Sequence, residues 1–85
     1  MIYKITFKKR ALKDLLSFPK NEVTRILTQI DQLAKNPRPP GAIKLSGNKD
    51  GIWRIRVGDY RVLYLIEDSI KIVEIHAIGN RKDVY

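Results

Sequence analysis

The sequence contains no cysteine and a single histidine, His76. The missing cysteines exclude disulfide bonds, thiolate metal sites and a thiol nucleophile, and they suit a reducing cytoplasm, where we expect the protein to work. One histidine leaves no second imidazole to share a metal. A glycine-rich phosphate loop, a pair of carboxylates and a Ser-His-Asp order are also missing. We therefore expect neither a metal nor another cofactor.

Long apolar runs are absent as well. The N-terminal stretch MIYKITFKKRALKDLL carries a charge every few positions, so it predicts neither a signal peptide nor a membrane span, and we expect no membrane partner. The chain has 85 residues, of which 44% are hydrophobic. That length and that composition predict one folded domain over residues 1–85.

Acidic residues are scarce relative to basic ones. Seventeen Lys and Arg face nine Asp and Glu, which gives a net charge of +8. An excess of this size on a small domain predicts attraction to polyanions, with nucleic acid as the first candidate and RNA before DNA. The alternative is a solvated surface that only keeps the protein soluble.

The N-terminal half predicts one strand and two helices. Residues 2–7 read as a strand, and the apolar residues that follow recur at helical spacing until Pro19 ends the first helix near Phe18. A second helix is predicted from Asn21, a good N-cap, to Lys35. Its apolar positions form one stripe, which predicts a face that packs on a sheet.

The C-terminal half predicts strands. After a stiff proline-rich connector come a short candidate strand at 42–45 and three strands rich in β-branched and aromatic residues, at 52–57, 60–66 and 70–78. Gly58-Asp59 and Asp68-Ser69 predict two-residue hairpin turns between them. The expected fold is α+β: an N-terminal strand, then two antiparallel helices packed on a mostly antiparallel sheet of about four strands.

The first hairpin turn fixes which residues face each other. A two-residue loop at Gly58-Asp59 puts Arg56 opposite Arg61 and Arg54 opposite Leu63, on the face away from the predicted core. Directly opposed like charges cost stability. We interpret the pair as an anion site, because the planar guanidinium fork suits phosphate. The alternative is that both side chains extend into solvent.

The second hairpin adds further residues to this face. A two-residue turn at Asp68-Ser69 places His76 opposite Arg61 and Glu74 opposite Leu63, with Glu74 free to pair with Arg54. The same register puts three apolar residues on the core face, namely Val73, Ile75 and Ala77. A lone strand histidine is more often structural or solvated than catalytic, so its predicted position beside Arg61 is the reason to consider a role in the site.

Two C-terminal motifs are similar to those of a known group of proteins. The stretch WRIRVGDYRVLY at Trp53–Tyr64, followed by GNRKDVY at Gly79–Tyr85, resembles the RelE/ParE toxin superfamily; the segments NPRPPG and KLSG fit the same pattern. The resemblance implies the strand, two-helix and sheet order described above. It further implies a RelE-type toxin that enters the ribosomal A site and cleaves mRNA without a metal, through attack of the 2′-hydroxyl on the adjacent phosphate.

The resemblance also implies a set of site residues. Carried over by position, the catalytic residues are Arg54, Arg56, Arg61, Arg81 and Tyr85, and the RNA-binding residues are Lys44, Lys49, His76 and Lys82.

Two departures from the family pattern concern proton transfer. Arg54 and Arg56 stand where some relatives carry lysine, and arginine does not deprotonate, so neither can be a general base. Asn80 stands where many relatives carry histidine. Tyr85 or His76 is left for proton transfer, although Tyr85 could equally be an apolar anchor for the terminus.

The implied partners are an acidic, partly disordered RelB-like antitoxin, the ribosome and mRNA, together with operator DNA bound by the toxin–antitoxin complex. Two alternatives stay open. A ParE-type protein of the same fold would inhibit DNA gyrase without ribonuclease activity. A third possibility is an RNA-binding or antitoxin-like module with no catalysis.

Overall fold

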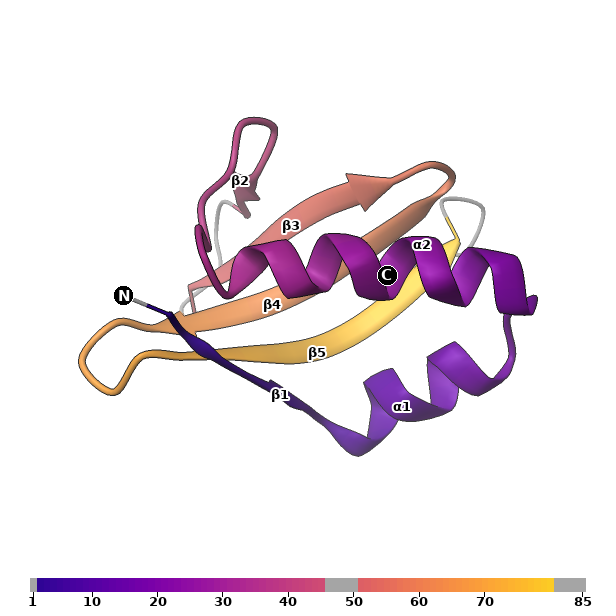
Figure 1. Cartoon of the computed structure of the whole chain (residues 1–85), viewed down its shortest axis with the longest axis horizontal. Coiled ribbons are helices and arrows are strands. Elements are labelled where there is room, and N and C mark those ends of the chain that lie inside the picture. Colours follow the sequence, from indigo (N-terminus) through magenta and orange to yellow (C-terminus); the bar gives the residue numbers. More distant parts are fainter. Residues whose placement is uncertain (1, 46–50, 81–85) are drawn as a thin grey trace.

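The computed structural model describes residues 2–45 and 51–80 and contains two helices on one side of a five-stranded sheet (Figure 1). The sheet order is β1-β5-β4-β3-β2, with β1 parallel to β5 and the other neighbours antiparallel. The α+β class is therefore confirmed. The strand beyond the expected four is β2, a two-residue strand at the edge of the sheet. The elements are β1 Lys4–Phe7, α1 Lys9–Leu16, α2 Lys20–Leu33, β2 Ile43–Lys44, β3 Ile52–Val57, β4 Tyr60–Glu67 and β5 Ile72–Asn80.

The start of α2 differs from the sequence prediction. Pro19, rather than Asn21, is the N-cap residue, and its carbonyl accepts hydrogen bonds from the backbone N–H groups of Glu22 and Val23 at 3.0 Å each. Proline suits a helix start because its φ is fixed near the helical value and its missing N–H would have no helical partner. Lys35 lies beyond the helix, which ends at Leu33.

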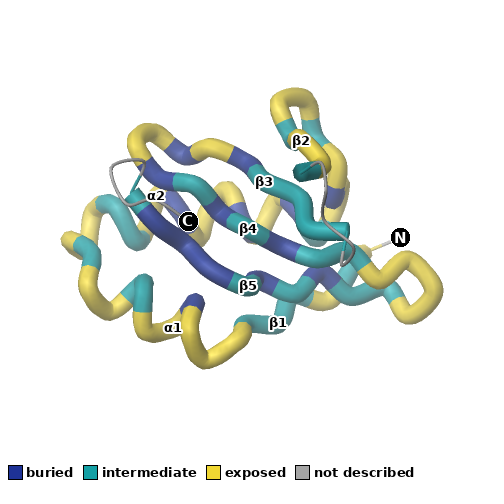
Figure 2. Tube along the Cα trace, turned by 180° about the vertical axis from the view of Figure 1, so that it is seen from behind, coloured by how far each residue is buried: buried dark blue, intermediate teal, exposed yellow. Residues whose placement is uncertain are grey.

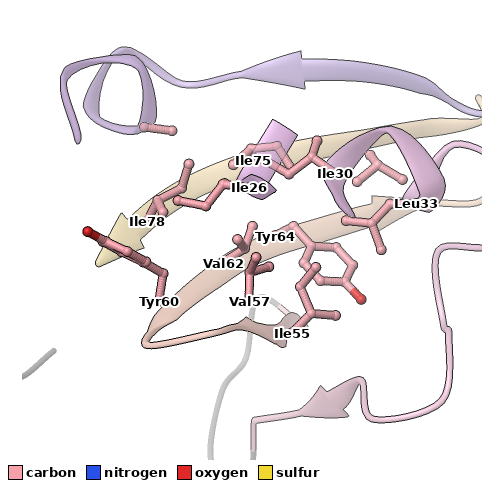
Figure 3. Packing of buried hydrophobic residues seen from close by; sticks show 12 residues of the cluster. Ile26, Ile30, Leu33, Ile55, Val57, Tyr60, Val62, Tyr64, Ile75 and Ile78 are labelled. Carbon is pink, nitrogen blue, oxygen red and sulfur yellow. The ribbon is translucent and has the colours of Figure 1, made fainter. Parts of the chain in front are cut away.

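The core forms where the apolar stripe of α2 meets the inner face of β3, β4 and β5 (Figure 3). Tyr64 is fully buried there, and its hydroxyl donates a hydrogen bond of 2.7 Å to the Pro37 carbonyl. Burial raises the pKa of Tyr64 to about 12. The hydroxyl therefore stays a donor and fixes the connector between α2 and the sheet. The fully buried side chains in this layer are Tyr64, Ile26, Ile30, Leu33, Ile75, Ile78, Val62 and Val73.

The β3–β4 hairpin has the register that the sequence predicts. Val57 pairs with Tyr60 and Arg56 with Arg61 around a turn in which Gly58 has a φ of +60°. The guanidinium of Arg25 from α2 also lies against Gly58, but this flexible side-chain end can move aside, so the positive φ is the reason for glycine. The hairpin is thus confirmed in both its turn and its pairing.

The β4–β5 connection corrects the second predicted turn. It spans four residues, 68–71, with Lys71 in the left-handed region at φ 55°, so Glu67 pairs with Ile72. A β-bulge then shifts the register between Leu63 and Tyr64.

The four-residue turn and the bulge together change every predicted partner on β5. Arg61 faces Gly79 rather than His76, and Leu63 faces Ala77 rather than Glu74.

The bulge also changes which residue of β5 enters the core. Tyr64 pairs with Ile75, and Val62 pairs with Ile78. Between these pairs β4 has only Leu63, which pairs with Ala77, so His76 is the extra residue of β5. Ala77 pairs with Leu63 on the open face, which corrects its predicted place in the core. Ile78 is buried against the helices instead, because its larger side chain fills more of the space beneath α1 and α2.

Asp68 joins three segments at the end of the sheet near the N-terminus. Its carboxylate accepts hydrogen bonds from Arg38 at 2.8 and 3.3 Å and from the Tyr3 hydroxyl at 2.7 Å. Arg38 in turn lies over the Trp53 ring, 5.4 Å from its centre. The bond to Arg38, followed by that to Tyr3, lowers the pKa of Asp68 to about 2.

Replacing Asp68 with Asn should therefore reduce stability in a pH-dependent way. A carboxyl whose pKa is lower in the folded state stabilises the fold above its unfolded value of about 3.9, and that contribution disappears as the pH falls through the folded value. The melting temperature of Asp68→Asn should be lower than that of wild type at neutral pH, and the two should converge toward about pH 2. A difference in melting temperature between the two proteins that is independent of pH would contradict this account.

Asp14 on α1 closes the part of β5 that β1 does not reach. The last β1–β5 pair is Phe7 with Ile75, and the Lys8 N–H donates to the Ile75 carbonyl at 2.9 Å. Beyond that point the Ile78 N–H donates to Oδ2 of Asp14, also at 2.9 Å. The carboxylate therefore takes the place that a neighbouring strand would occupy.

Asp14→Ala should leave the Ile78 N–H without this partner. The expected loss is about 1–3 kcal/mol, the cost of an unsatisfied donor in a partly buried site. Chemical denaturation measures it, with Asp31→Ala on the exposed side of α2 as the matched control. Equal stability of the two variants would show that water replaces the carboxylate at no cost.

Candidate anion-binding site on the open face of the sheet

Four of the predicted site residues lie on the face of the sheet that the helices leave uncovered, the face turned to the viewer in Figure 2: Arg54, Arg56, Arg61 and His76. Buried and partly exposed residues alternate along β3 and β4, with Ile55 and Val62 facing the helices. The alternation turns Arg54, Arg56 and Arg61 to the opposite side. Arg56 is exposed, whereas Arg54 and Arg61 are half-buried.

Three strands meet at Arg61. It stands opposite Arg56 on β3 and opposite Gly79 on β5. Gly79 is buried and has no side chain, so the residue of β5 that faces Arg61 brings no charge to this face. The predicted like-charge pair is thus confirmed, and no acidic side chain stands directly opposite either member of it.

The Nε atoms of Arg54 and Arg61 are both buried, and neither has a hydrogen-bond partner among the described residues. A buried donor without an acceptor costs about 1–3 kcal/mol, and more when it is charged. An anion bound on this face would supply the missing acceptors. Phosphate fits the requirement well, because a guanidinium can donate two parallel hydrogen bonds to its oxygens.

A small pocket lies at the hairpin end of this face. It has a volume of about 100 Å³ and is lined by Arg56, Gly58, Asp59, Tyr60 and Arg61. The guanidinium of Arg25 lies against Gly58 at the same end, where it is ion-paired with Glu22 at 3.5 Å. Sequence reasoning missed Arg25, because its place on a solvent-facing position of α2 gives no sign of the contact with a distant hairpin.

His76 and Glu74 form a pair on β5. Their Nε2 and Oε1 atoms lie 2.9 Å apart, and both side chains are about one-third exposed, 28% for His76 and 35% for Glu74. The predicted pairing of Glu74 with Arg54 is therefore replaced by one within the strand. His76 precedes Ala77, the partner of Leu63, so it lies three residues along β5 from Gly79, which takes its predicted place opposite Arg61.

The remaining predicted residues are not brought into this site by the described structure. Lys44 pairs with Trp53, which packs against the core, so its position in the register belongs to the other face of the sheet. Lys49, Arg81, Lys82 and Tyr85 lie outside the described residues.

Two further searches of the described residues complete the picture. Within 2–45 and 51–80, no group of three His, Asp or Glu side chains is placed to hold a metal ion. None of the helices in those ranges is long and apolar enough to cross a membrane.

Comparisons with known proteins give one consistent assignment. Residues 5–85 match the family described as the ParE toxin of the type II toxin–antitoxin system parDE. The chain is also 31% identical over 87 aligned positions to the protein RelE1 of Methanocaldococcus jannaschii, covering 100% of this chain and 97% of that protein.

Solved structures with the same fold include two toxin–antitoxin complexes. The chain matches the RelE–RelB complex of Pyrococcus horikoshii with 34% identity and a TM-score of 0.84, covering 99% of this chain and 100% of the solved one. It matches the RelBE2 complex of Mycobacterium tuberculosis with 26% identity and a TM-score of 0.86, covering 98% and 95% of the two chains.

The arginine arrangement predicts an unusual response to mutation. Arg61→Leu removes a repulsion and an unpartnered buried donor, so it should melt at the same temperature as wild type or higher. Sulfate at millimolar concentration should raise the melting temperature of wild type and have much less effect on the variant. Thermal melts of both proteins with and without sulfate measure this. A destabilised Arg61→Leu that still responds to sulfate would show that Arg61 serves packing instead.

Proposed function

Since this chain belongs to the ParE toxin family of type II toxin–antitoxin systems, within the RelE/ParE superfamily, we propose that it is a RelE-type endoribonuclease that cleaves mRNA on the ribosome. Residues 1–85 would act as one toxin domain in the cytoplasm, where translating ribosomes are found. Cleavage would stop translation. The open face of the sheet would bind the mRNA backbone at the position that is cut.

The observation that carries this proposal is the pair of buried Nε donors on Arg54 and Arg61, which have no partner among residues 2–45 and 51–80, next to the like-charged pair of Arg56 and Arg61. Such a surface is suited to a group whose charge grows during a reaction. When a 2′-oxygen attacks the adjacent phosphorus, the phosphoryl oxygens gain negative charge, and fixed guanidinium groups stabilise it.

The proposed cleavage would depend mainly on the positioning of the reacting atoms and on stabilisation of the negative charge that develops on the phosphoryl oxygens. The bond between the 2′-oxygen and phosphorus forms while the bond to the 5′-oxygen breaks, which leaves a 2′,3′-cyclic phosphate and a free 5′-hydroxyl. Holding the 2′-hydroxyl in line with the leaving oxygen contributes most of the rate that orientation can give. By resemblance, Arg81 and Tyr85 would complete the site.

A RelB-like antitoxin is the proposed partner that restrains this activity. Two of the structurally similar proteins were solved as complexes with their antitoxins. A domain with a net charge of +8 and an exposed Arg56 favours an acidic segment that orders as it wraps the basic face. The pair together would bind operator DNA.

The family match also supports a second candidate. The matching family model is the ParE one, so inhibition of DNA gyrase without RNA cleavage is the alternative activity. The half-buried arginines on an open sheet face favour the ribonuclease, because a protein that only docks on another protein has no need to leave charged donors unpartnered.

We predict cleavage of mRNA on translating ribosomes and little cleavage of the same RNA free in solution. Among the described residues, the open face of the sheet holds one acid/base candidate pair and three arginines, so the ribosome would have to orient the substrate for in-line attack. Mapping mRNA 3′ ends after incubation with programmed ribosomes measures the activity. Equal rates on free and ribosome-bound mRNA would contradict the proposed dependence.

A parallel assay tests for the alternative activity, inhibition of DNA gyrase. The same preparation is tested for accumulation of cleaved DNA in the presence of gyrase. Gyrase inhibition without any new mRNA ends would replace the ribonuclease with the ParE-type function. Arg61→Leu separates the two further, because it should lose mRNA cleavage by a factor that corresponds to about 3–4 kcal/mol of lost charge stabilisation.

A further inference from the structure

We propose that His76 is the general base of the RNA cleavage reaction and that Glu74 orients it. This inference rests on the proposed function and deepens it, because it names the group that accepts the proton from the 2′-hydroxyl. The arginines cannot do this, since arginine stays protonated in proteins. Among the described residues, a base therefore has to come from another side chain on the same face.

The contact between the two side chains fixes the state of the imidazole. The Glu74 carboxylate only accepts hydrogen bonds, so the 2.9 Å contact requires His76 to donate from Nε2. In the neutral ring the lone pair is then on Nδ1. A carboxylate that holds one ring nitrogen while the other takes a proton is the arrangement by which acid/base histidines are aligned and their charged form is stabilised.

The β-bulge accounts for why His76 is available on this face. Ile75 and Ile78 both point into the core, although strict alternation would send only one of them there. The extra residue at the bulge lets His76 stay on the open side while Ile78 returns to the core. Bulges that re-aim a side chain in this way are common next to active sites.

The sheet spacing places His76 at a suitable distance from the arginines. Arg54, Leu63 and Ala77 lie in one row across β3, β4 and β5, and His76 precedes Ala77. Strands are about 4.8 Å apart, so the backbones at the two ends of this row are about 10 Å apart. A phosphate above Leu63 would be reached by the long Arg54 side chain from one side and by the imidazole from the other.

The step balances without any further reactant except water. Nδ1 of His76 takes the proton from the 2′-hydroxyl as the 2′-oxygen bonds to phosphorus. The bond from phosphorus to the 5′-oxygen breaks, and the leaving oxygen takes a proton from water. The imidazolium is stabilised by Glu74 until it returns its proton to solvent.

The test measures single-turnover cleavage on programmed ribosomes with four variants: His76→Gln, Glu74→Gln, the double variant, and Asp31→Asn as the matched control on the exposed side of α2. Loss of a general base should slow cleavage by about 10²–10⁴-fold in His76→Gln. Glu74→Gln should slow it less, because an amide oxygen still accepts from Nε2. The double variant should be no slower than His76→Gln, since the two residues act as a unit. Asp31→Asn should cleave like wild type.

A second substrate separates a base from an acid. Replacing the 5′-bridging oxygen at the cleaved position with sulfur gives a leaving group that needs no proton. A variant that lacks the base stays slow on this substrate, because the 2′-hydroxyl still has to lose its proton. Recovery of His76→Gln to the wild-type rate would mean that His76 protonates the leaving oxygen, and this would overturn the proposal.

The remaining outcomes are also decisive. A His76→Gln variant that melts at a lower temperature yet cleaves at the wild-type rate would assign the pair to stabilising the bulge. If His76→Gln does not fold, Glu74→Gln keeps a hydrogen bond to the ring, and a wild-type rate in that variant would refute the orienting role. Wild-type protein that cleaves no mRNA on ribosomes would refute the proposed function and this inference together, whereas cleavage by wild type and His76→Gln alike refutes the inference alone.

Discussion

Arg56 and Arg61 stand opposite each other on β3 and β4, so the central hairpin has to carry two like charges on neighbouring strands. Directly opposed like charges destabilise a strand pair by a few tenths to about 1 kcal/mol, and the unpartnered Nε of Arg61 adds to that cost. The other face of the same strands offsets it: Ile55, Val62 and Tyr64 pack against α2 in a dry core. Packing of the buried face stabilises the hairpin, so the open face can carry side chains that bind an anion.

The two ends of the sheet are organised differently. At the end near the N-terminus, Asp68 accepts from Arg38 and Tyr3, so the charges there are paired within the fold. At the hairpin end, Arg56 and Arg61 line a small pocket and no described acid stands directly opposite either of them. Among the described residues, Arg38 is ion-paired with Asp68, whereas Arg56 and Arg61 form no ion pair although Asp59 lines the same pocket. This contrast is the reason to assign function to the hairpin end and stability to the other.

Much of the fold could be predicted from sequence because the determining interactions are local. The glycine at Gly58 fixes the first hairpin, and with it the pairing of Arg56 with Arg61. The predicted β4–β5 register was wrong, because the local sequence pattern does not decide which apolar residue of β5 enters the core. Ala77 and Ile78 are both apolar, so either could enter the core, and only the volume available beneath the helices selects the larger one. The contacts of Arg25 with Gly58 and of Asp14 with Ile78 join residues far apart in sequence, and no local signal announces them.

The central claim is that the unpartnered donors of Arg54 and Arg61 are kept for an RNA phosphate. It can be observed directly from the Nε–Hε resonances of the arginine side chains during titration with a short RNA whose 2′-hydroxyl at the cleavable position is replaced by hydrogen. The resonances of Arg54 and Arg61 should shift and become protected from exchange with solvent, while that of Arg38, which is already bonded to Asp68, should stay unchanged. Uniform small shifts across all arginines, or shifts confined to Arg38, would contradict the claim.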